Sequence, residues 1–198
     1  MRVGVLALQG DVREHISSLI ACGVNPTSVR RSSELDQIDA LVLPGGESTT
    51  IAQLSEVFGM YDQIKVRISQ GMPVYGSCAG MILLAEEILD AKKGQKSFGG
   101  LDITVRRNAF GRQVDSFESD IAFADGSTDL IHAVFIRAPW VEKVGQGVRV
   151  LASVGTRPVA VRSETLLATS FHPEITGDHR IHRYFIEEVA RPALEQVQ

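Results

Sequence analysis

The stretch Val74-Tyr75-Gly76-Ser77-Cys78-Ala79-Gly80, followed by Met81-Ile82-Leu83-Leu84-Ala85-Glu86-Glu87, decides the fold. An apolar strand changes into a helix here, and a cysteine stands between two glycines. A sharp strand-to-helix turn needs residues without a Cβ on either side of the central residue, so that strand and helix pack closely. Gly76 and Gly80 meet that need. The stretch predicts a nucleophile elbow, at which the helix dipole favours the thiolate of Cys78.

The same pattern also fits an ordinary loop around a small buried thiol. A cysteine at such an elbow can act as a nucleophile only with a base and a group that orients the base. Cys22 stands before Gly23 at the end of an expected helix, and we interpret it as such a buried thiol. Cys78 remains the candidate nucleophile.

A candidate base and its orienting group follow the apolar run 166–170, in Phe171-His172-Pro173-Glu174. Pro173 disfavours helical angles at His172, so we expect an extended tripeptide with the side chains of His172 and Glu174 on the same side. The carboxylate would hold one imidazole nitrogen and leave the other to take a proton from a thiol. The pattern predicts a Cys-His-Glu triad. We expect the remaining histidines to be ordinary surface or boundary residues: His15, His132, His179 and His182.

Length and composition favour one domain, residues 1–198, with a sizeable core. Hydrophobic residues make up 44% and charged residues 22%, as in ordinary globular proteins, and the net charge of −4 favours no nucleic-acid partner. The two cysteines suggest no disulfide framework, and the chain offers no signal peptide and no apolar run of membrane-spanning length. We therefore expect a cytoplasmic protein without a membrane partner. No histidine-cysteine cluster has zinc spacing, and we expect no metal and no cofactor.

Short apolar runs alternate with helical patterns, which predicts an α/β fold: a mostly parallel sheet with helices on both faces. Asp11 with Glu14 resembles a helix N-cap, followed by an apolar helix face at Val12, Ile16, Leu19 and Ile20. The predicted strands are 3–8, 27–30, 40–43, 73–76, shorter strands within 101–138, and strands near 148–154, 159–161 and 166–170. The predicted helices are that N-terminal helix, the elbow helix, 51–58, 63–70 and a last helix from 178, with a polar connection over 92–100.

In the order cysteine, histidine, glutamate, the chain resembles the class I glutamine amidotransferases, from its first strand to its last helix. Four motifs resemble the PdxT family more narrowly, the glutaminase subunit of pyridoxal 5′-phosphate synthase in vitamin B6 biosynthesis. They are Leu8-Gln9-Gly10-Asp11-Val12-Arg13-Glu14-His15, Leu43-Pro44-Gly45-Gly46-Glu47-Ser48-Thr49-Thr50, the segment 107–117 and Phe135-Ile136-Arg137-Ala138-Pro139. The resemblance implies a flavodoxin-like sheet and hydrolysis of L-glutamine to glutamate and ammonia. It also implies a hetero-oligomeric complex in which a synthase subunit receives the ammonia.

The substrate and its transition state call for particular groups. An oxyanion needs backbone N–H donors, which Gly46 after the Pro44-Gly45 turn and Ala79 after the nucleophile can supply. At the resembling motifs, Arg107 and Arg137 would meet the glutamine carboxylate, Glu47 the ammonium, and Ser48 a further polar group. Ile136 belongs to the same substrate motif. Arg112, Gln113 and Asp115 share the 107–117 motif without an individual role.

Delivery of ammonia to a partner predicts a gate. The residues Gln9 and Gly10 follow the first strand, at the sheet edge where open α/β folds bind ligands and where Gly46 is expected. A glycine-rich oxyanion loop can hold its peptide in an unproductive orientation until a partner favours the other one. We expect Gln9 and Gly10 to take part in this switch.

Three other interpretations stay open at this point. The chain could be the glutaminase subunit of another complex, such as imidazole glycerol phosphate synthase, although the 107–117 motif argues against this. It could be an elbow-cysteine hydrolase of the DJ-1/PfpI type, against which the His172-Pro173-Glu174 and Pro44–Ser48 motifs count. A non-enzymatic interaction module is the third interpretation, because a fold does not determine function.

Overall fold

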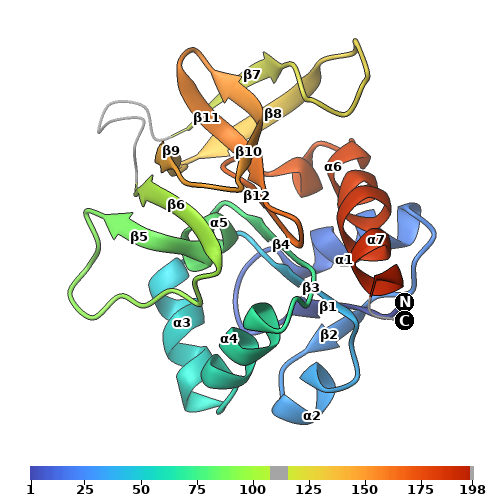
Figure 1. Cartoon of the computed structure of the whole chain (residues 1–198), viewed down its shortest axis with the longest axis vertical. Helices are drawn as coiled ribbons and strands as arrows, with labels where there is room; N and C mark the ends of the chain where they lie inside the picture. The colour runs from blue at the N-terminus through green and yellow to red at the C-terminus, as the bar shows by residue number, and fades with distance from the viewer. Residues whose placement is uncertain (108–115, 197–198) are drawn as a thin grey trace.

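A seven-stranded sheet forms the centre of the computed structural model, which describes residues 1–107 and 116–196 (Figure 1). The strand order is β10-β11-β12-β4-β3-β1-β2. The bounds are β1 Val3–Leu6, β2 Thr27–Val29, β3 Ala40–Leu43, β4 Val74–Ser77, β10 Arg149–Val154, β11 Arg157–Arg162 and β12 Leu166–Thr169. Strands β2, β1, β3, β4 and β12 are parallel, and β11 and β10 continue the sheet antiparallel. The predicted mostly parallel α/β sheet is confirmed.

Helices cover both faces of this sheet, on opposite sides in Figure 1. Leu41 and Leu43 of β3 belong to one apolar cluster, whereas Ala40 and Val42 belong to the other, because successive side chains of a strand point to opposite faces. The first cluster includes side chains of α2 Ser32–Leu35, α3 Ser48–Val57, α4 Tyr61–Ser69 and α5 Ala79–Leu84. The second includes side chains of α1 Val12–Ala21, α6 Arg180–Tyr184 and the π-helix η2 Phe185–Ala190, which continues into α7 Arg191–Glu195.

Two small sheets accompany the large one. Strands β5 Ala85–Leu89, β6 Leu101–Arg106 and β9 Trp140–Val144 form the first, and β7 Ser116–Ile121 pairs with β8 Ile131–Ile136 in the second. Neither β5 nor β9 was expected from the sequence: no strand was predicted between the elbow helix and the connection over 92–100, whereas α5 ends at Leu84 and β5 follows it. The glutamate-rich segment of β5 is a strand because it pairs with β6, so tertiary pairing overrides its helical propensity.

The N-terminal helix differs from its predicted pattern. Ile20, expected on the buried face of α1, is 59% exposed, while His15 is fully buried beside Leu19. The buried stripe of α1 is therefore shifted from the predicted one. Asp11 stands at the N-cap position, but its side chain makes no capping hydrogen bond, so the predicted cap is not formed.

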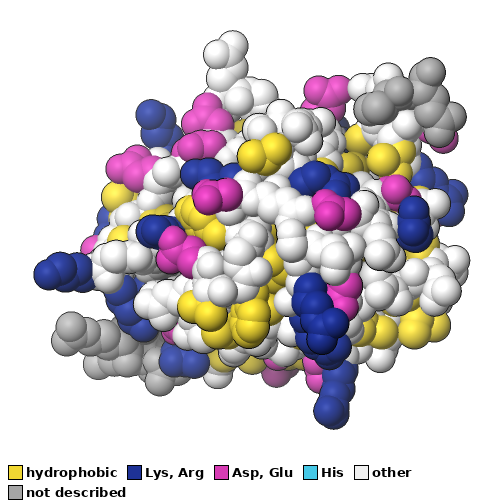
Figure 2. All heavy atoms as spheres, turned by 90° about the horizontal axis from the view of Figure 1, so that it is seen from below, with side chains coloured by type: hydrophobic (Ala, Val, Ile, Leu, Met, Phe, Trp, Pro, Cys, Tyr) yellow, Lys and Arg dark blue, Asp and Glu magenta, His cyan; other side chains and the backbone are white. Residues whose placement is uncertain are grey.

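Basic and acidic side chains are interspersed on the face shown in Figure 2. Within residues 1–107 and 116–196, no helix has the length and apolar character needed to cross a membrane.

Candidate active site

The nucleophile elbow is formed as predicted, with Cys78 at the N-cap of α5. Cys78 has φ 48° and ψ −98°, a conformation that a residue with a Cβ rarely adopts. A Cβ on Gly76 would lie 2.5 Å from the Gly80 carbonyl, and one on Gly80 would lie 2.4 Å from the carbonyl oxygen of Leu43. The two glycines therefore allow β3, β4 and α5 to approach closely around the cysteine.

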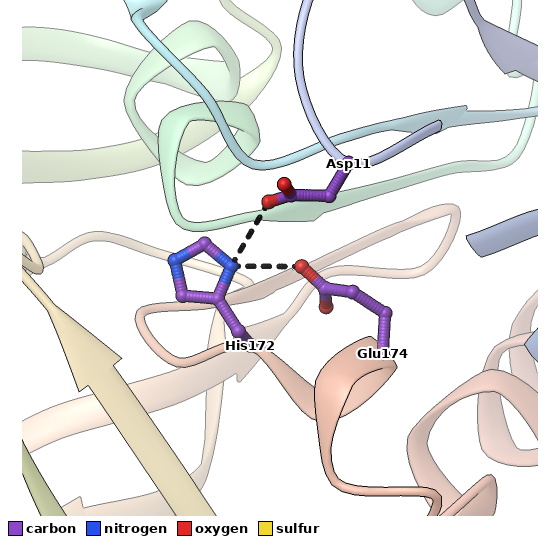
Figure 3. A group of neighbouring side chains, drawn as sticks. All are labelled: Asp11, His172 and Glu174. Carbon is purple, nitrogen blue, oxygen red and sulfur yellow. Dashed lines mark hydrogen bonds and ion pairs between the residues drawn. The ribbon is translucent and has the colours of Figure 1, made fainter. Parts of the chain in front are cut away.

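His172 enters the site from the end of β12. Its Nδ1 lies 2.8 Å from Oε1 of Glu174 and 3.4 Å from Oδ2 of Asp11, and Figure 3 shows the two carboxylates approaching this one nitrogen. The predicted extended tripeptide is wrong, because Pro173 begins a 3₁₀ turn, η1 Pro173–Ile175. Proline suits the first position of such a turn. The predicted meeting of the two side chains is nevertheless present.

The charges of this pair stabilise each other. Burial alone would lower the pKa of His172, but hydrogen bonding with Asp11, Cys78 and Glu174 raises it to about 12. Burial would raise the pKa of Glu174, but the neighbouring His15 and the hydrogen bond with His172 lower it to about 2. We therefore describe the pair as an imidazolium and a carboxylate, with Cys78 in contact with the imidazolium.

Two further groups, neither of them expected from the sequence, surround the Glu174 carboxylate. The hydroxyl of Ser77 donates to Oε1 and Oε2 at 3.1 and 3.3 Å. The Nε2 of His15 lies 3.5 Å from Oε1. Strand alternation could have indicated Ser77, because it precedes the nucleophile and points to the other side of β4.

Every predicted substrate and oxyanion residue lines one cleft together with Cys78 and His172. The cleft also contains Gln9, which was predicted as a gating residue, and three residues that were not predicted as site residues: Asp11, Ile82 and Lys92. The predicted members that it brings together are Gly46, Glu47, Ser48, Ala79, Arg107, Ile136 and Arg137. Arg112, Gln113 and Asp115 lie outside the described residues.

Arg107 is buried in this cleft and is held by polar contacts. It donates to Oε1 of Glu47 at 3.0 Å and to the side-chain oxygen of Gln95. The amide nitrogen of Gln95 in turn donates to the hydroxyl of Ser48 at 3.0 Å, and Nζ of Lys92 lies 3.6 Å from Glu47. The polar connection over 92–100, for which the sequence suggested no role, thus supplies two residues to the site.

The loop after β1 packs on the predicted oxyanion loop after β3. The side-chain oxygen of Gln9 accepts a hydrogen bond from the Glu47 N–H at 2.8 Å, and the Asp11 N–H donates to Gly45 at 3.1 Å. A Cβ on Gly10 would lie only 1.8 Å from the carbonyl oxygen of Gly45. Gly10 must therefore be glycine for the two loops to touch.

Asp11, His172 and Glu174 each offer a ligand atom within 4.8 Å of the others, a spacing that could hold a cation. The same Nδ1 of His172, however, is at hydrogen-bond distance from Glu174. We interpret the cluster as an imidazole oriented by carboxylates, since the same ring also interacts with Cys78.

A cysteine on a strand-to-helix elbow, beside a histidine-carboxylate pair at the carboxyl edge of a parallel sheet, defines a class of α/β thiol enzymes. A family model agrees with this class and narrows it. The chain belongs to the SNO glutamine amidotransferase family, whose model matches residues 5–191.

Individual relatives agree with the family. The chain is 60% identical to "Pyridoxal 5′-phosphate synthase subunit PdxT" of Parafrankia sp. (strain EAN1pec), over 95% of this chain and 93% of the relative. It is 58% identical to the protein of that name from Nocardia farcinica (strain IFM 10152), over 94% and 85%. A solved structure, "Crystal structure of glutamine amidotransferase", aligns with a TM-score of 0.87 at 48% identity, over 93% of this chain and 97% of that one. The predicted resemblance to the PdxT family is confirmed.

Proposed function

We propose that this chain is the glutaminase subunit of a pyridoxal 5′-phosphate synthase and hydrolyses L-glutamine to glutamate and ammonia. The observation that carries the proposal is the placement of Cys78 beside the His172–Glu174 pair, in a cleft that also holds Arg107 and Glu47. The relatives' name favours this function over imidazole glycerol phosphate synthase or a DJ-1/PfpI-type hydrolase. We infer that residues 1–198 act as one glutaminase domain.

Catalysis would begin with attack of the Cys78 thiolate on the side-chain amide carbon of glutamine. The oxyanion would accept hydrogen bonds from the N–H groups of Gly46 and Ala79. His172 would then donate its proton to the leaving nitrogen, so that ammonia departs and a glutamyl thioester remains. His172, now neutral, would take a proton from water as the water attacks the thioester. Glutamate leaves, and the thiolate-imidazolium pair is restored.

The remaining cleft residues would bind the charged end of glutamine. Arg107 and Arg137 are the cations available for its carboxylate, and Glu47 is the anion available for its ammonium, with Ser48 nearby. Because Arg107 and Glu47 pair with each other at 3.0 Å, the cleft already holds a cation and an anion side by side. This preorganisation supports binding of a zwitterion.

We infer that a synthase subunit is the partner, and that docking switches the oxyanion loop. The contacts from Gln9 to the Glu47 N–H and from Asp11 to Gly45 support a gate in the 9–11 loop. Gln9→Ala should reduce activation by the partner more than it reduces docking. Ammonia release with and without the partner, beside sedimentation analysis of binding, tests this. Full activity of the lone subunit, or normal activation of the variant, would refute the gate.

The nucleophile is tested by labelling with a diazoketone analogue of glutamine. We expect the label on one peptide, the one that contains Cys78, and none on Cys22, for which burial raises the pKa of the thiol. Cys78→Ala should abolish ammonia release while partner binding persists. Labelling of Cys22 with Cys78 unmodified would contradict the assignment.

A further inference from the structure

Helix α1 places His15 against Glu174, on the side away from Cys78. The His15 side chain is fully buried, and its Nε2 lies at ion-pair distance, 3.5 Å, from Oε1 of Glu174. Among the described residues this nitrogen makes no hydrogen bond. Its other nitrogen, Nδ1, lies 2.9 Å from Nε2 of His182 on α6, which is also fully buried. The two rings therefore extend the line of polar groups from His172 and Glu174 into the core.

The contacts determine which nitrogens of these rings carry hydrogen. A lone pair on Nε2 of His15 would face the negative Glu174 carboxylate, which is repulsive, so this nitrogen must carry the proton. A neutral His15 then has an acceptor at Nδ1, which requires that Nε2 of His182 be the donor. Burial lowers the pKa of both histidines, which agrees with neutral rings.

We propose that His15 is a positioning residue for the triad: its Nε2–H faces the Glu174 carboxylate and attracts it electrostatically, and His182 holds His15 in the required tautomer. The proposal deepens the proposed function, because it concerns the same triad. Glu174 then has hydrogen-bond donors in His172 and Ser77, and the Nε2–H of His15 faces it from a third side, which restrains the carboxylate from rotating away from the imidazole. Fixing an orienting carboxylate in this way maintains the geometry of the base.

Other charged groups also act on His15. Glu174 and Asp11 favour its protonated form, as does Glu14 on its own helix, while His172 opposes it. The test must therefore separate positioning from a general change in charge or packing. The variant His15→Gln keeps a neutral N–H donor of similar reach, whereas His15→Leu keeps the bulk and removes the donor.

The first measurement needs neither glutamine nor a partner. The rate at which iodoacetamide alkylates Cys78 is followed against pH in the intact protein, with Cys22→Ser as the common background. Because His172 contacts the Cys78 thiol, misplacing the imidazole should lower the alkylation rate across the pH profile, about tenfold near pH 7, in His15→Leu. His15→Gln should restore most of the rate, and His182→Leu should show a smaller change in the same direction.

The second measurement is turnover in the complex with the synthase subunit. His15→Leu should lower kcat about tenfold with little change in KM, because His15 does not line the substrate cleft. Leu19→Ala, another buried change on α1, is the control: it should lower the melting temperature without moving the alkylation profile. An unchanged profile in His15→Leu, or a His15→Gln as impaired as His15→Leu, would overturn the proposal. If wild type failed to hydrolyse glutamine, the proposed function would fall, while alkylation would still decide the role of His15.

Discussion

Asp11 and Glu174 share a single nitrogen of His172, but their surroundings differ. Glu174 is buried and 2.8 Å from Nδ1, whereas Asp11 is 39% exposed at its side chain and 3.4 Å away. The shorter contact in the drier environment is the stronger one. Glu174 is therefore the main orienting group, and Asp11 assists it.

Glu174→Gln should lower kcat by about 10²–10⁴, because an amide can hold the imidazole but does not stabilise the imidazolium. Asp11→Asn should lower it less than about tenfold, because solvent screens that charge. Steady-state ammonia release in the complex measures both. A larger loss in Asp11→Asn than in Glu174→Gln would reverse the assignment of the two carboxylates.

The contacts of Arg107 predict an effect of Gln95 on substrate affinity. Arg107→Ala should raise the Kd for glutamine about tenfold or more, since it leaves a charged end of the substrate unpaired. Gln95→Ala should raise it by a smaller factor, because Arg107 loses one hydrogen bond and keeps the one to Glu47. Calorimetric titration on the Cys78→Ala background measures binding without chemistry. Arg106→Ala is the matched control, because Arg106 pairs outside the cleft with Asp90 and Glu142.

Sequence patterns identified residues whose chemistry is local, and they missed residues that act through tertiary contacts. Cys78 lies between its glycines, and Glu174 follows His172 by two positions. Their proximity in the chain was therefore enough to predict them as site residues. His15 and Gln95 meet the site only after folding, across 159 and 12 positions. The expectation that His15 and His182 are surface or boundary residues is wrong for that reason: both are fully buried.

At the scale of elements, the close approach of α5 to β3 makes a specific demand on Gly80. Alanine normally stabilises a helix relative to glycine by about 1 kcal/mol. Gly80→Ala should instead destabilise the protein, because the new Cβ would lie 2.4 Å from a backbone oxygen of Leu43. Denaturant unfolding measures the change. Gly59→Ala is the control for backbone strain, because a Cβ there would meet nothing within 4 Å although φ is +68°. It should lower the free energy of unfolding less than Gly80→Ala does.

Elements with simple patterns were predictable, and those that depend on pairing were not. The prediction for residues 40–43 matches β3, because a short apolar run that ends at the Pro44-Gly45 turn is typical of a buried strand. The segment 85–89 contains helix-favouring glutamates and becomes β5 only through its partner β6. Likewise, β9 carries charged residues and follows a proline, so its pairing with β6 was not visible in the sequence.

At the scale of the whole molecule, buried histidines should make the protein sensitive to acid. Burial lowers the pKa of His15, and it lowers that of His182 from 6.5 to about 3. A group with a lowered folded pKa stabilises the protein above its unfolded pKa and loses that contribution as the pH falls. The free energy of unfolding should therefore decrease below pH 6.5, by up to about 1.4 kcal/mol per pH unit for each such histidine.

Two other groups complete the pH dependence. Glu174, with its pKa lowered to about 2, adds to the loss below its usual value of 4.5. His172 has a raised pKa, so its contribution is complete below 6.5 and falls only as the pH rises toward 12. Urea unfolding measures the free energy of unfolding at pH 7.5 and at pH 5. The difference between these two values should be smaller in His182→Leu than in wild type. His132→Gln should not reduce it, because Asp120 and Glu118 raise the pKa of that exposed histidine.

The backbone of Cys78 stores strain at the residue that the proposed reaction uses, at a cost to thermal stability. A side chain held at φ 48° costs on the order of 1–3 kcal/mol, which glycine avoids at an entropic cost of about 0.5–1 kcal/mol. Cys78→Gly should therefore melt at a higher temperature than Cys78→Ala, although both lack the thiol. Equal melting temperatures would mean that the elbow is relaxed. If Cys78→Gly also melted above wild type, the more heat-resistant form of this protein would be an inert one, so a screen for thermostability alone would select against the reaction.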